Sequence, residues 1–199
     1  MRKIVSGALA LTISSFVVVA AAAATTTAPA VRIAAPTSAW QALDDATIVA
    51  IFDGANTADI ETGDLAAKLG NTSEVREFGA MLSRDHKQVR QLGRDLAKKL
   101  GVTPTPPKVD QGAIDHAAAM KRLGALKGAA FDHAFLQQEV AFHAAVIDAV
   151  NKTLLPAIHN AEVKALVVKV TPAFTGHMIA AQTLDKKLFP NGSAARPGM

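Results

Sequence analysis

Residues 72–101, TSEVREFGAMLSRDHKQVRQLGRDLAKKLG, carry the most regular helical pattern in this chain. Apolar side chains recur there at steps of three and four residues, which is the spacing of one face of an α-helix. A glycine at position 101 is a common helix stop. His86 stands in the apolar row, between Leu82 and Val89. The stretch therefore predicts a long amphipathic helix that turns a histidine toward the protein interior.

Alanine and leucine dominate the rest of the chain, and strand-like alternation is scarce, so the whole domain is predicted to be helical. Further long helices are expected at about 44–69, 129–153 and 161–188, with a shorter, weaker one within 110–128. Such an extended link between the second and third long helices allows them to run parallel, as in ferritin-like bundles. The predicted fold is an all-α, ferritin-like four-helix bundle with a long crossover that carries a short extra helix.

Two prolines bear on the helix ends. Leu154-Leu155-Pro156 is expected to break the third long helix, because proline removes a backbone donor. At Thr171-Pro172, two alternatives remain open. The threonine caps a fresh helical segment, or the proline kinks one continuous helix.

The start of the chain follows the plan of a secretory signal peptide. Arg2 and Lys3 precede an apolar stretch, and Ala20–Ala24 offers small residues for cleavage. The alternative is an uncleaved inner-membrane anchor, since Ile4–Ala24 is just long enough to span a bilayer. We expect a periplasmic or secreted protein. Its expected parts are a signal peptide at 1–24, a flexible segment at 25–43, a helical bundle at 44–189 and a disordered tail at 190–199.

Composition argues against several functions. The formal charge is +4, half of it from Arg2 and Lys3, and the remaining basic residues are interleaved with acids, so no nucleic-acid partner is expected. Without cysteine, the chain has no disulfide and no thiolate metal site. No nucleophile motif or phosphate-binding glycine loop occurs, which leaves enzymatic activity uncertain. We expect no membrane contact after signal cleavage; a homo-oligomer and the identity of any protein partner stay open.

Three histidines suggest a metal site. His86, His143 and His177 each lie on the apolar side of a different long helical pattern, and Asp59 borders the apolar row of the first. Side chains from facing helices of a bundle can converge on one interior point. Imidazole and carboxylate ligands suit zinc, iron or copper. The sequence therefore predicts one divalent transition metal bound by these four residues.

Three other acids are candidates for supporting roles around the ligands. Asp85 and Glu139 lie close in sequence to His86 and His143, where a carboxylate could orient a ring nitrogen. Glu61 is the third, although it points further aside and fits a solvent-facing position better. Two alternatives remain open: a structural or interaction bundle whose buried polar groups only specify packing, and a mononuclear metalloenzyme, which needs an open coordination position.

Several stretches also carry a family resemblance. They are Ala58–Ala66, then Val75–Phe78 leading into Asp85-His86, then Phe131-Asp132 followed by Phe142-His143, and finally Pro172 five residues before His177. In order and spacing the chain resembles the bacterial family called domain of unknown function 4142 (DUF4142), a group of exported ferritin-like proteins. The resemblance implies that fold, an export signal, an acid at position 59 and the three histidines, but it supplies no function.

The chain departs from better-known ferritin-like proteins at one point. Their di-iron sites place a glutamate three residues before a histidine on two helices. Here those positions hold Ser83, Val140 and Phe174. A single ion is therefore expected, with storage, buffering or envelope stress protection as its purpose.

Overall fold

The computed structural model describes residues 43–192, and within that range the chain is all-helical, with no strand. The predicted signal peptide, the predicted flexible segment up to residue 42 and residues 193–199 of the predicted tail lie outside the described residues. None of the helices in the described range combines the length and the apolar character that a membrane span requires.

Five helices of more than ten residues form the described part of the chain: α1 (Asp45–Leu69), α2 (Ser73–Leu100), α3 (Gln111–Gly124), α4 (Gly128–Ala149) and α6 (Ala161–Leu188). Capping residues set their starts. The Asp44 side chain accepts a hydrogen bond from the Thr47 amide at the start of α1, and Thr72 accepts one from Val75 at the start of α2. Gly101 ends α2 with a φ of 66°, in the left-handed region.

The predicted break at Leu154-Leu155-Pro156 is wrong. After α4 the chain continues through a π-helical turn, η1 (Val150–Leu154), into the short α5 (Leu155–Ala157). Pro156 follows this π-helical turn after one residue, and the helix ends at Ala157. At the other proline no fresh helical segment begins, because α6 runs unbroken through Pro172.

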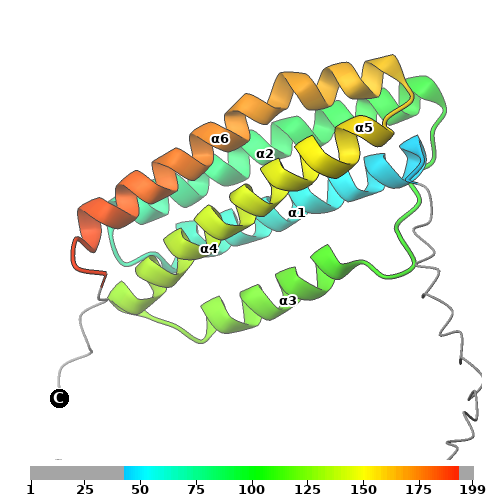
Figure 1. Cartoon of the computed structure of the whole chain (residues 1–199). Helices are drawn as coiled ribbons and strands as arrows, with labels where there is room; N and C mark the ends of the chain where they lie inside the picture. Colours follow the sequence, from blue (N-terminus) through cyan, green and yellow to red (C-terminus); the bar gives the residue numbers. More distant parts are fainter. Residues whose placement is uncertain (1–42, 193–199) are drawn as a thin grey trace, which may run out of the picture. The chain divides into compact units, whose positions relative to one another are not determined.

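The four long helices pack side by side in pairs. α1 packs along α2 and α4 along α6, while α2 also contacts α6 and α1 contacts α4. Figure 1 shows α2 and α4 running in the same direction, because the chain returns along α3 between them. α3 contacts α1 and α4 from outside the group of four.

The interior is layered along the helix axes. One apolar cluster gathers Ile48 and Phe52 of α1 with Val163 and Val167 of α6. A second apolar cluster is built from residues such as Leu82, Phe131 and Phe135. Between the two clusters, each long helix contributes buried polar side chains, which we call the buried polar cluster: Asp59, His86, Glu139, His143 and His177.

Two aspartates tie the turns of the bundle to neighbouring helices. Asp132 of α4 is fully buried, and its two oxygens accept hydrogen bonds from the Asn71 and Thr72 amides at 2.7 and 2.9 Å. Asp45 of α1 accepts hydrogen bonds in the same way from the His159 and Asn160 amides, just before α6. Each carboxylate thereby satisfies amides that the turn leaves without a helical partner.

α1 and α2 approach so closely that only glycine fits between them. A Cβ atom on Gly79 would lie 2.7 Å from the Ala66 Cβ and 2.7 Å from the Gly63 carbonyl oxygen. Gly79→Ala should therefore force the two helices apart and lower the free energy of unfolding by about 1–3 kcal/mol. Urea denaturation followed by circular dichroism measures this change.

Gly54 on α1 provides the matched control, since a Cβ there would meet no atom of residues 43–192 within 4 Å. Gly54→Ala should raise the free energy of unfolding by about 0.5–1 kcal/mol, because alanine loses less backbone entropy in a helix. If Gly79→Ala were as stable as the wild type, α1 and α2 could move apart to fit the methyl group without a loss of stability.

Candidate metal centre

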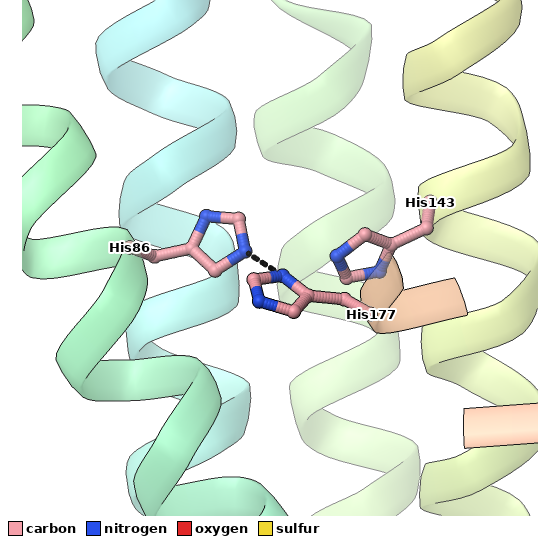
Figure 2. Close-up of side chains that lie close together, drawn as sticks. All are labelled: His86, His143 and His177. Carbon is pink, nitrogen blue, oxygen red and sulfur yellow. Dashed lines mark hydrogen bonds between the residues drawn. The ribbon is translucent and has the colours of Figure 1, made fainter. Parts of the chain in front are cut away.

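The three predicted histidines meet in the interior, each from a different helix (Figure 2). His86 comes from α2, His143 from α4 and His177 from α6. His86 Nε2 lies 3.1 Å from His177 Nδ1, and one ring nitrogen of each histidine lies within 4.8 Å of the others. All three are buried, with exposed fractions of 1, 1 and 8 % in chain order. Three imidazoles at this spacing could bind a common metal ion.

Hydrogen bonds to the outer ring nitrogens fix the protonation of His143 and His86. His143 Nδ1 lies 3.0 Å from the Glu139 backbone oxygen, which can only accept, so Nδ1 carries the proton. His86 Nδ1 lies 2.9 Å from Asn56 Oδ1, and Asn56 Nδ2 donates to the Phe52 carbonyl. The amide is thus oriented to accept from His86. In both rings, the Nε2 lone pair is left for the interior.

A neutral His177 ring cannot donate a hydrogen bond to both of its neighbours. His177 Nε2 lies 3.4 Å from Asp85 Oδ2, and its Nδ1 faces His86 Nε2. Both of these partners are acceptors, whereas a neutral imidazole carries one proton. If His177 donates to the Asp85 carboxylate, two nitrogen lone pairs face each other at 3.1 Å. A cation bound by both nitrogens would remove this conflict.

Two buried carboxyl groups complete the buried polar cluster. Asp59 Oδ1 lies 3.9 Å from His143 Nε2, and Asp59 Oδ2 lies 3.4 Å from His86 Nδ1. Glu139 Oε2 lies 3.5 Å from His143 Nδ1. Within residues 43–192, Asp59 Oδ1, Glu139 Oε2 and His143 Nε2 have no hydrogen-bond partner. A proton held between the two carboxyls would pair Asp59 with Glu139. His143 Nε2 would still be unpaired, at a cost of about 1–3 kcal/mol, and its lone pair fits a bound metal ion.

Burial sets the charge of the cluster. It lowers the pKa of His86 to about 3 and that of His143 to about 4, and it also lowers the pKa of His177. The rings are therefore neutral at pH 7, the state that binds metals. Burial raises the pKa of Asp59 well above its ordinary value and that of Glu139 to about 7. The two carboxyls thus retain a proton near neutrality, when no cation is bound.

The supporting acids fall into different places. Glu139, expected beside the ligands, forms a second group with Asp59 and His143, in which one ligand atom of each lies within 4.8 Å of the others; Asp59 thus meets the three histidines through His143. Asp85 lies at the border of the cluster, where its carboxylate contacts His177 Nε2 and can orient that ring. Glu61 does not reach it, because this exposed carboxylate lies 2.7 Å from His116 Nε2 instead.

Sequence reasoning missed two residues that shape the site. Asn56 orients the His86 ring, and Phe174 stacks on it with ring centroids 5.4 Å apart and planes 10° from parallel. A signal for Asn56 was available, since it is a polar residue four positions after Phe52 in an otherwise apolar row. Phe174 carried no such signal, because a phenylalanine on an apolar face is ordinary core.

These pKa shifts predict how the stability of the metal-free protein depends on pH. Below pH 6.5 the unfolded chain binds protons on three histidines whose pKa values are lowered in the folded protein, to about 3 for His86 and about 4 for His143. Asp59 and Glu139 act oppositely, since the folded pair keeps a proton that the unfolded chain has lost. Three histidines outnumber two carboxyls. The free energy of unfolding should therefore rise with pH up to about 6.5 and then fall as the pH passes 7.

Urea denaturation in the presence of EDTA, at intervals between about pH 4 and 8, measures this profile. A maximum near pH 6.5 is expected. The variant His143→Leu should show a shallower acidic limb, because one of the three titrating rings is gone. A flat profile on the acidic side would mean that the folded and unfolded states bind equal numbers of protons there, so that the histidines do not dominate the pH dependence.

A comparison with known protein families finds one that matches the chain. The model of a family described as Domain of unknown function (DUF4142) matches residues 22–184, a range that covers every residue of the buried polar cluster. No curated protein and no solved structure matches the chain. The family's description names no activity, so a function must be argued from the geometry above.

Proposed function

The chain belongs to the DUF4142 family, as its resemblance indicated, and from this we propose that it is an exported, ferritin-like bundle that binds one divalent transition metal. The proposed ligands are His86, His143, His177 and Asp59. The parallel course of α2 and α4, with α3 in the crossover, supports the ferritin-like assignment. Metal storage, buffering or envelope stress protection is the role we assign to such a site.

The main support for this proposal is the arrangement of the ring nitrogens of the three histidines. Metal-binding histidines usually donate their outer N–H to a carbonyl, an amide or a carboxylate. His86, His143 and His177 each have such an acceptor: an amide oxygen, a backbone carbonyl and a carboxylate, respectively. The inner nitrogens then converge with free electron pairs. A network built only for packing would pair its atoms, whereas here His143 Nε2 has no hydrogen-bond partner among the described residues.

Asp59 is the fourth proposed ligand. Its Oδ1 atom is unpartnered within the described residues and lies nearer than 4 Å to His143 Nε2. Because the Asp59–Glu139 pair retains a proton near neutrality, metal binding should release it to solvent. Three imidazoles and one carboxylate suit zinc best, and iron or copper next.

Zinc titration of protein purified without a polyhistidine tag tests the proposal. We expect about one ion per chain and a rise in melting temperature that EDTA reverses. At a free zinc concentration 1,000 times Kd, the stabilisation should be about 4 kcal/mol, or roughly 10 °C for a domain of this size.

The variant His116→Leu serves as the control, since this histidine pairs with Glu61 outside the cluster. It should bind zinc as the wild type does. A wild-type protein that binds no stoichiometric ion, and whose melting temperature does not respond to EDTA, would leave the structural bundle as the better interpretation.

A further inference from the structure

The buried polar cluster is closed to solvent on most sides. Asp59, His86, Glu139 and His143 have exposed fractions of 1 to 3 %. Phe174 covers the face of the His86 ring, and the two apolar clusters lie above and below along the helix axes. An ion from solvent therefore needs a particular route to reach the inner nitrogens.

One side of the cluster is open enough to provide that route. His177 is its most exposed member, at 8 %. The side chain of Asp85, which lies against His177, is 34 % exposed, and its Oδ2 atom lies 3.4 Å from His177 Nε2. This carboxylate is thus in contact with both solvent and the outermost proposed ligand.

We propose that Asp85 is the capture point at which a hydrated divalent cation first binds, before it passes His177 into the cluster. This inference rests on the proposed metal site and assigns its entrance. A partly exposed carboxylate attracts a divalent cation, and it lies beside the ring that must accept the cation next.

Arg84 limits this attraction. Its Nε and Nη2 atoms lie 3.0 and 2.9 Å from Asp85 Oδ1, the oxygen that does not face His177. The guanidinium therefore neutralises part of the carboxylate's field at the entrance. Since the Arg84 side chain is 72 % exposed, removing its charge should not disturb the core.

The variant Asp85→Asn distinguishes two roles of this side chain, the attraction of the cation and the orientation of the His177 ring. The asparagine oxygen can still accept a hydrogen bond from His177 Nε2, so the ring keeps its tautomer, but the negative charge is gone. One charge acting on a divalent ion through about 6 Å of water changes the local ion concentration roughly 10-fold. The association rate should fall by that factor, while the dissociation rate changes little.

Stopped-flow absorbance with Co²⁺ alone measures both rates, because cobalt bound by imidazoles gains visible bands. We expect Asp85→Asn to bind about 10-fold more slowly than the wild type, and Arg84→Gln to bind several-fold faster. Both differences should shrink at high ionic strength. Asp95→Asn is the control, since it removes an equal charge on the same helix about 15 Å away.

The rates and the visible bands distinguish failure of the entrance from failure of the metal site. An unchanged association rate in Asp85→Asn, or a change in dissociation alone, would overturn Asp85 as the entrance while leaving the metal site intact. A wild-type protein that gains no visible bands with Co²⁺, and likewise binds no zinc, would overturn the proposed function and the entrance together.

Discussion

Replacement of His143 by leucine is expected to weaken zinc binding by about 10²- to 10³-fold. A structural zinc site with four ligands supplies about 10–16 kcal/mol, so the loss of one ligand removes roughly 3–4 kcal/mol. His143 is the sharpest choice among the three rings, because its inner nitrogen is unpartnered within the described residues. Competition with a chromophoric chelator at pH 7 measures the affinity.

The same variant should leave the metal-free protein within about 1 kcal/mol of wild-type stability. Leucine removes a buried nitrogen that has no hydrogen-bond partner in the part of the chain that the structure describes, and the Glu139 carbonyl that His143 contacts also belongs to the backbone of α4. His116→Leu again serves as the control for a histidine outside the cluster. Unchanged zinc affinity in His143→Leu would exclude this ring as a ligand.

Replacement of Asp132 by alanine is expected to lower the free energy of unfolding by about 3–5 kcal/mol. The carboxylate accepts from two amides at the turn between α1 and α2, and hydrogen bonds to charged groups contribute roughly 1.5–3 kcal/mol each. Asp132 is fully buried, so water cannot replace it. Urea denaturation should show the loss as a lower midpoint with an unchanged slope.

Asp45→Ala is the matched comparison. Asp45 also accepts from two successive amides, but its site is partly exposed, so water can take over the bonds. We expect a loss of only about 1–2 kcal/mol there. If the two substitutions had equal effects, burial would not be the reason for the importance of Asp132.

Local sequence signals predicted most of the helical layout. The apolar spacing, together with Gly101 as a helix stop, gave α1 and α2 nearly their observed bounds. The error came at Pro156, where proline was taken as a break. A π turn ahead of it let the helix continue, and such a turn depends on packing that no local signal records.

What the sequence determined by itself is which helix face each residue occupies. The spacing of apolar residues fixed the angular position of His86, His143 and His177 around their helices, so their burial could be predicted. Periodicity says nothing about how far one helix slides along another, however, and a shift of one turn moves a side chain by about 5.4 Å. Only the packing of α1, α2, α4 and α6 decided that these rings, Asp59 and Glu139 lie at one level, because that sliding distance is set by contacts between helices rather than within them.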